Sequence, residues 1–151
     1  MSPPFNERFN LARFESAQAP LYERALGELR RGRKESHWMW FVFPQLAGLG
    51  TSSMARHYAI QVREEAAAYL LHPVLGSRLL ECCRTLLAVN GRSAAEIFGS
   101  PDDLKLRSSM TLFAQVAGPG SVFSQVVDHY YAGQMDCRTL ELLERVSKPG
   151  S

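Results

Sequence analysis

Glu65 is the residue of this chain best suited to acid–base chemistry. If one helix covers residues 54–69, spacings of three and four place Glu65 on a stripe with Met54, Tyr58, Val62 and Tyr69. Burial among apolar and phenolic side chains favours the neutral form of a carboxyl group, and such a group serves as a general acid or base near neutral pH. The alternative is a purely structural role at a helix start. We take Glu65 as the candidate catalytic residue.

Both tryptophans lie in one short, mostly apolar segment, residues 34–45. His37, Trp38, Trp40 and Gln45 supply its aromatic faces and polar tips. Such side chains can hold a flat ring, for example a purine or nicotinamide, and orient it. The alternative is a structural segment that ends at Pro44, because aromatic side chains usually belong to the core. Under either interpretation we expect Trp38 and Trp40 to be largely buried.

Residues 48–53 precede an expected helix and form a candidate anion site. Gly48, Gly50 and Ser52 place backbone N–H groups and a hydroxyl near the positive end of the helix dipole. The lysine of a Walker loop is absent. The alternative is a plain turn in which Ser52 or Ser53 caps the helix.

Cationic, hydroxyl and phenolic groups elsewhere complete the candidate ligand site. Lys105, Ser108 and Thr111 share neighbouring faces of one expected helix and would donate to a phosphate or ribose. The alternative is close helix packing, with the hydroxyls bonded back to carbonyls. Arg78 would clamp a phosphate or carboxylate, unless it pairs with a carboxylate of the protein itself. Tyr58 would stack on the ring of the ligand together with Trp38.

The composition bounds the class of protein. The chain has 151 residues, of which 46% are hydrophobic, and a net charge of +2. We therefore expect one domain over residues 1–151, with frayed ends at residues 1–5 and 148–151. The apolar runs are much shorter than the roughly 18 to 20 residues that span a bilayer, and no signal peptide is visible. Basic residues 30–34 sit at an expected helix end beside glutamates, so nucleic-acid binding is not expected. The three cysteines lack metal-ligand spacing, which predicts a cytoplasmic protein without disulfide, metal or cofactor.

The elements that must position these residues are helices. Leucine occurs 19 times and alanine 16 times, against two isoleucines, which favours helix over strand. We predict an all-α fold, a single compact multi-helix domain of about seven to nine short helices. Proline, serine and glycine signals place helices at about residues 20–32, 73–89, 101–117, 121–132 and 136–146.

Finer signals refine these boundaries. Ser93 with Glu96 and Ser100 with Asp103 have the spacing of capping boxes. The helix at 101–117 should bury a face that consists of Leu106, Met110, Phe113 and Ala117. A short first helix should carry Phe9, Leu11 and Phe14.

Several strings of the sequence resemble a known family. They are Arg13-Phe14-x-x-Ala17-Gln18, the run from Trp38 to Gln45, Gly48-Leu-Gly50, Tyr58-Ala-Ile60, the segment from Glu65 to Leu79, and the segment from Lys105 to Phe113. Together they look like the small bacterial proteins of domain-of-unknown-function family 1810, sometimes labelled calpastatin-like. The resemblance covers nearly the whole chain and implies a compact all-helical domain without an established activity. In that family a serine is usual at position 62, which makes Ser-x-x-Glu a capping box; Val62 cannot cap in this way.

A more distant similarity is to the NADAR proteins, which are linked to ADP-ribose metabolism and to cleavage of an N-glycosidic bond. In that family a glutamate before a His-Tyr pair is expected to be catalytic, whereas Arg56 precedes His57-Tyr58 here. We therefore predict a helical domain that binds a small anionic, ring-containing metabolite such as a nucleotide or ADP-ribose derivative. If it is an enzyme, it is a hydrolase of the N-glycosidase type. The alternative is a non-catalytic protein-interaction module.

Overall fold

The computed structural model describes residues 8–147, and this part of the chain is helical. Its ten helices are α2 (Ala12–Gln18), α3 (Tyr22–Arg30), α4 (Met39–Val42), α5 (Ser53–His57), α6 (Arg63–Leu71), α7 (Leu75–Ala88), α8 (Ala94–Phe98), α9 (Asp102–Ala117), α10 (Val122–Tyr131) and α11 (Cys137–Ser147). The predicted all-α class is confirmed, with more helices than the seven to nine expected. The prediction of frayed ends at 1–5 and 148–151 concerns residues outside the described range.

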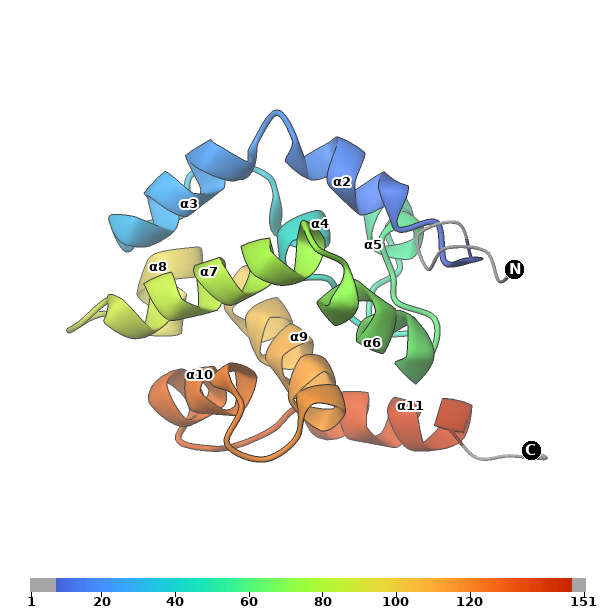
Figure 1. Ribbon diagram of the computed structural model, residues 1–151. Coiled ribbons are helices and arrows are strands. Elements are labelled where there is room, and N and C mark those ends of the chain that lie inside the picture. Colours follow the sequence, from blue (N-terminus) through green and yellow to red (C-terminus); the bar gives the residue numbers. More distant parts are fainter. Residues whose placement is uncertain (1–7, 148–151) are drawn as a thin grey trace.

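The helices pack in layers around α7 and α9. Figure 1 shows α2 and α3 on one side, α7 across the middle, and α10 and α11 on the opposite side. Helix α9 contacts α6, α8, α10 and α11, while α7 contacts α3, α6 and α10. The largest fully buried side chains include Phe14, Trp38, Phe43, Tyr69 and Phe113. One hydrophobic core therefore draws on segments from both ends of the described chain.

The predicted helix starts are confirmed where serine precedes a helix. Ser93 and Glu96 form a full capping box at α8. Ser52 caps α5 by accepting a hydrogen bond from the Ala55 N–H at 3.1 Å, and Ser121 caps α10. The predicted box of Ser100 and Asp103 is wrong, because α9 begins at Asp102 and the residue at its cap position is Pro101, which makes no side-chain cap bond.

Helix α9 buries most of its predicted face. Leu106, Met110 and Phe113 are fully buried, whereas Ala117, the last residue of the helix, is exposed. The helix ends there because Gly118 adopts a positive φ of 97°, a conformation that glycine accommodates without steric cost.

The segment at residues 54–69 is not one helix. Residues 58–62 are irregular, and Ile60 forms an isolated parallel bridge with Leu46. The Ala47 N–H donates to the Ile60 carbonyl at 2.8 Å, and the Ile60 N–H donates to the Gln45 carbonyl at 2.9 Å. Val62 is the extended cap residue of α6 and makes no side-chain cap bond. The stripe of Met54, Tyr58, Val62, Glu65 and Tyr69 therefore does not form, and the helix break survives the loss of a capping serine at position 62.

Trp38 is fixed in the core by a buried carboxylate. Its side chain is fully buried, and its indole N–H donates to Glu28 Oε1 at 2.9 Å. Glu28, itself 1% exposed, also accepts hydrogen bonds from the backbone N–H groups of Glu35 and Ser36 and from the Ser36 hydroxyl. Burial alone would raise the pKa of Glu28, but these hydrogen bonds outweigh it and lower the pKa to about 2. Helix α3 is thereby tied to the turn that precedes α4.

Two further findings concern the length of the apolar helices and the state of the cysteines. None of the helices within residues 8–147 is long and apolar enough to cross a membrane. All three cysteines are free. Burial raises the pKa of the Cys82 thiol to about 12 and raises that of Cys83 as well, so both thiols stay protonated at neutral pH.

Glu28 gives the fold a pH dependence. Because its pKa is lower in the folded chain than the ordinary 4.5, its contribution to stability is complete above about pH 4.5 and is lost as the pH falls toward 2. We expect the free energy of unfolding to fall in that window. In Glu28→Gln, which keeps the shape but not the titration, this part of the fall should be absent. Urea titrations of both proteins between pH 2 and 6 measure the difference, and parallel pH profiles would contradict this role of Glu28.

Candidate functional site

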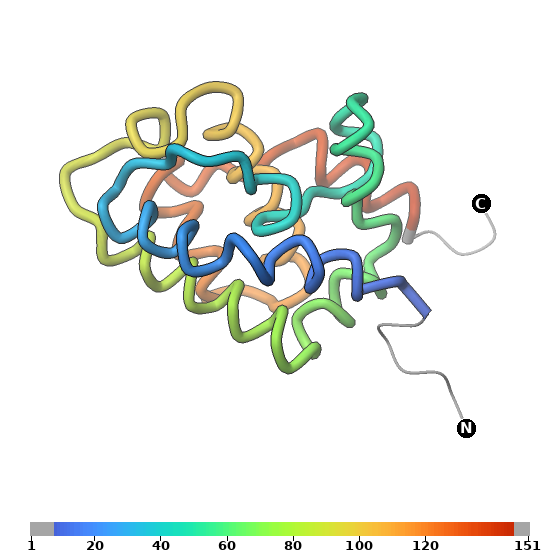
Figure 2. Tube along the Cα trace, turned by 90° about the horizontal axis from the view of Figure 1, so that it is seen from above, coloured from blue at the N-terminus to red at the C-terminus, as the bar shows by residue number. Residues whose placement is uncertain are grey.

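The main candidate site is a groove between the turn that leads into α5 and the first half of α9. Its volume is 420 Å³, and it is lined by Gln45, Leu49, Gly50, Thr51, Ser52, Ala55, Pro101, Leu104, Lys105, Ser108 and Asp136. Five of the residues predicted from sequence to bind a ligand are among them: Gln45, Gly50, Ser52, Lys105 and Ser108. Figure 2 shows the segment that leads into α5 on the same side of the molecule as the start of α11. Three separate stretches of chain thus build one groove.

Lys105 supplies the positive charge of this groove. Its Nζ lies 3.5 Å from Asp102 Oδ1, while Asp102 Oδ2 pairs with Lys34 Nζ at 2.9 Å. One carboxylate is therefore shared between two ammonium groups, and the shorter contact is with Lys34. The Lys105 side chain is 26% exposed. An anion that enters the groove would meet an ammonium group that is only partly neutralised.

Trp40 forms the base beneath Lys105. The ammonium lies 5.2 Å from the centroid of the indole ring, within the range of a cation–π interaction. Trp40 is half-buried. Its indole N–H is buried and has no hydrogen-bond partner within the described residues. This ring therefore helps to place Lys105, although it is not itself among the residues that line the groove.

Asp136 closes the far side of the groove and has its charge compensated. Its Oδ2 accepts hydrogen bonds from Ser108 Oγ at 3.1 Å and from the Thr139 N–H at 3.0 Å, as well as from the Thr139 hydroxyl. Its Oδ1 lies 3.9 Å from Arg107 Nη2. Asp136 thereby caps α11 and ties it to α9. Sequence analysis did not identify this residue, although Asp-x-x-Thr at a helix start is a recognisable capping pattern.

The hydroxyls of α9 have mainly structural partners. Ser108 and Thr111 donate to the carbonyls of Leu104 and Arg107, one turn earlier, which is the bonding that the packing alternative predicts. Thr111 is fully buried and its Oγ1 also accepts from the Asp136 N–H at 2.9 Å. It therefore lies behind the groove and not in its wall.

The glycines shape the turn that faces α9. A Cβ at Gly50 would lie 2.6 Å from the Ala55 Cβ, which is closer than atoms can approach without a shift. Gly48 adopts a φ of +99° and, with Gly50, lines a smaller hollow of 90 Å³ next to the groove. Glycine is therefore needed for close approach at position 50 and for backbone conformation at position 48. Helix α5 has only five residues, and one of the N–H groups of its first turn, that of Ala55, already donates to the Ser52 hydroxyl.

Three aromatic residues predicted to contact a ligand lie elsewhere. Trp38 is fully buried against Glu28, so its proposed stacking on a ligand is corrected to a core role. Tyr58 is half-buried and packs against the rings of Phe14 and Phe41. His37 is exposed and lines none of the hollows described here.

Glu65 lies in a different hollow, of 380 Å³, together with Arg13, His57 and Gln61. Its side chain is 3% exposed. Its Oε2 pairs with Arg13 Nη2 at 2.8 Å, and its Oε1 accepts from the Gln61 N–H at 2.9 Å. The carboxylate therefore has a charged partner in place of the apolar and phenolic surroundings expected from the stripe. Both oxygens are engaged, and this hollow shares no lining residue with the groove at Lys105.

Arg78 also lies apart from the groove, in a trough between α3 and α7. Its guanidinium packs 4.9 Å from the centroid of the Tyr22 ring, and Nη1 lies 3.4 Å from Gln18 Oε1. The alternative of pairing with a carboxylate of this protein is not realised within residues 8–147. In the same range, no cluster of three or more His, Cys, Asp or Glu side chains is placed to hold a metal ion.

Comparison with known proteins identifies the family. Residues 8–143 match the family model described as Protein of unknown function (DUF1810), and the chain belongs to this family. The chain is also similar to the crystal structure of the conserved hypothetical protein Rv1873 from Mycobacterium tuberculosis, with 55% sequence identity and a TM-score of 0.89 over 91% of this chain and 98% of that chain. No curated protein shows significant similarity to this chain.

The close contact at Gly50 predicts how the groove responds to one added methyl group. Gly50→Ala should destabilise the protein by roughly 1 to 3 kcal/mol, because its Cβ overlaps the Ala55 Cβ. Ala55→Gly removes that overlap at its own cost of about 1 kcal/mol. In the Ala55→Gly background, Gly50→Ala should therefore cost much less. Chemical denaturation of the four proteins of this cycle gives the coupling energy, and additive effects would show that the two residues do not meet.

Proposed function

We propose that this member of the DUF1810 family binds a small anionic metabolite with a flat ring, of the nucleotide class, in the groove at Lys105. The observation that carries the proposal is the Lys105 ammonium, which faces the groove and shares its one carboxylate with Lys34. A phosphate or carboxylate of the ligand would complete its charge pairing. The groove volume of 420 Å³ is in the range of small-molecule sites.

An apolar wall beside Lys105 supports the ring-containing part of the ligand. Leu104 is 56% exposed although it is a large hydrophobic side chain, and it lines the groove with Leu49 and Pro101. A ring placed against Leu104 would remove this apolar surface from water. The Gln45 side chain, on the opposite wall, offers an amide donor and acceptor that would orient the ring.

The proposal is for binding and not for hydrolysis. Glu65 lies in another hollow, with both of its oxygens occupied. The carboxylate that does line the groove, Asp136, is held by Ser108 and Thr139. An intracellular location forms part of the proposal and is supported by the three free thiols, because reducing compartments keep cysteines unpaired.

Ligand-induced stabilisation tests the proposal. We expect adenosine monophosphate or ADP-ribose to raise the melting temperature of the wild-type protein more than adenosine or inorganic phosphate alone. Adenosine supplies only the ring contacts, and inorganic phosphate supplies only the contact with the Lys105 ammonium. Lys105→Met should weaken binding by about tenfold or more, since a charge-assisted contact is lost.

The matched control is Arg24→Met, which removes one positive charge from an exposed position of α3. Arg24 lines neither the groove at Lys105 nor the trough between α3 and α7. This variant should bind the nucleotides as the wild type does. A melting temperature that none of these compounds changes at millimolar concentration, or an equal loss of affinity in Lys105→Met and Arg24→Met, would contradict the proposal.

A further inference from the structure

The trough between α3 and α7 concentrates positive charge. It has a volume of 620 Å³ and is lined by Arg30, Ser77, Arg78, Glu81, Arg84, Thr85 and Ala88. Three arginines and one glutamate give this lining a net charge of +2, which equals the net charge of the whole chain. The lining is therefore locally basic, which favours the approach of an acidic partner.

The arginines of the trough are not neutralised by the protein. Within residues 8–147, none of the three has a carboxylate oxygen within 4.0 Å of its guanidinium. Glu81, the one carboxylate of the lining, instead accepts a hydrogen bond from the Tyr22 hydroxyl. Arg78 is held in place by the Tyr22 ring and Gln18 but keeps most of its five N–H donors unused. It is thus preorganised to receive an anion.

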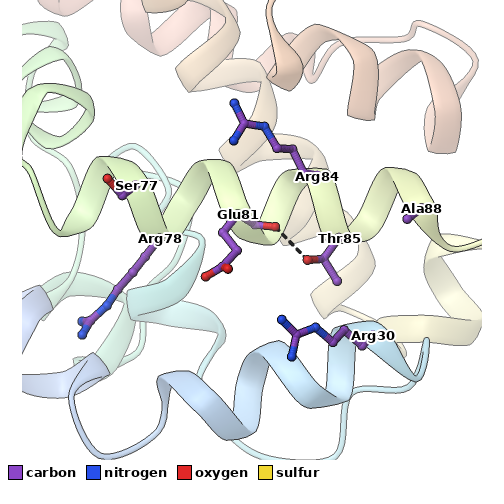
Figure 3. A pocket seen from close by; sticks show the side chains of 7 residues that line it. All are labelled: Arg30, Ser77, Arg78, Glu81, Arg84, Thr85 and Ala88. Atoms are coloured by element: carbon purple, nitrogen blue, oxygen red, sulfur yellow. Dashed lines mark hydrogen bonds between the residues drawn. The ribbon is translucent and has the colours of Figure 1, made fainter.

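Arg30 and Arg78 lie at separate points of the trough. Figure 3 shows Arg78 extending from α7 toward α3 and Arg30 lying along α3, with Glu81 between the two in this view, whereas Arg84 points away from α3. A helix rises about 1.5 Å per residue, so Arg78 is about 5 to 10 Å along α7 from the levels of Glu81 and Thr85. A single compact anion that touched both arginines would also lie against Glu81. Two separate anionic groups therefore fit the trough better than one.

The lining resembles an interface more than a small-molecule pocket. Five of its seven residues are exposed, and Ala88 is its one apolar side chain, whereas small-molecule sites are mostly apolar and enclose their ligand. The hydroxyls of Ser77 and Thr85 already donate to the carbonyls of Pro73 and Glu81. Recognition therefore depends on the guanidinium groups, and arginine is enriched at protein–protein interfaces.

We propose that the trough between α3 and α7 is a docking surface for an extended acidic segment of a partner protein. In an extended chain, side chains on one side recur every two residues, about 7 Å apart. Such a segment presents its carboxylates as separate groups, as two arginines on different helices, Arg30 on α3 and Arg78 on α7, require. This surface shares no lining residue with the groove at Lys105, so the two proposals stand or fall separately.

Fluorescence anisotropy with short labelled peptides tests the docking surface. The probe is the peptide Glu-Ser-Glu-Ser-Glu, and the comparison peptide Glu-Glu-Glu-Ser-Ser has the same charge in a clustered order. We expect the alternating peptide to bind more tightly. Arg30→Gln and Arg78→Gln should each raise its Kd about two- to fivefold, as expected for partly exposed ion pairs.

Arg24→Gln is the matched control, because it removes the same charge from an exposed position of α3 outside the trough; it should leave the Kd unchanged. Arg30 is exposed and is the last residue of α3, so its variant keeps the test decisive even if Arg78→Gln unfolds. Equal effects of Arg24→Gln and Arg30→Gln would reduce the interaction to net charge and overturn the proposal. Stabilisation by inorganic pyrophosphate without binding of either peptide would overturn it in favour of a small-anion site.

Discussion

The Arg13 guanidinium is the contact on which the candidate groove depends. All five of its N–H donors are used. Nε donates to the His57 carbonyl at 2.9 Å, and Nη1 donates to the Phe9 and Asn10 carbonyls. Nη2 donates to the Ala59 carbonyl at 2.9 Å and to Glu65 Oε2 at 2.8 Å. One side chain of α2 therefore fixes the residues before α2, the end of α5, the irregular segment 58–62 and the first turn of α6. Removal of a charge costs most when its partner is left buried and unpaired, which applies to Glu65.

The consequence of this contact reaches the groove through the backbone. Glu65 Oε1 accepts from the Gln61 N–H, and the neighbouring Ile60 exchanges hydrogen bonds with Gln45 and Ala47. Residues 45–52, which form one wall of the groove at Lys105, are thereby anchored to a segment that Arg13 holds. The opposite wall is anchored independently, because Asp136 ties α11 to α9. The groove is thus a junction of two hydrogen-bonded units, and the contacts of Glu65 help to position one of its walls.

Local signals in the sequence predicted the helices well and the long-range partners poorly. Ser93 with Glu96, Ser52 and Ser121 are caps that depend on neighbours three residues away, so they are readable from spacing. The partner of Trp38 is Glu28, and the partner of Glu65 is Arg13, which is 52 residues distant; no periodicity encodes such a pair. The predicted helix at 54–69 failed because backbone pairing of Ile60 with residues 45–47 outweighs helix propensity there. That break also explains why Glu65 and Lys105, predicted to share one site, face different hollows.

Amide hydrogen exchange of Arg13→Met tests most directly whether Arg13 holds the wall of the groove. The probes are the N–H groups of Ala47 and Ile60, which form the bridge, and the reference is the buried Val127 on α10. The account predicts that exchange at Ala47 and Ile60 accelerates about tenfold or more relative to Val127, since the opening of residues 45–61 becomes easier than global unfolding. Exchange that changes equally at all three amides, or not at all at the bridge, would contradict it.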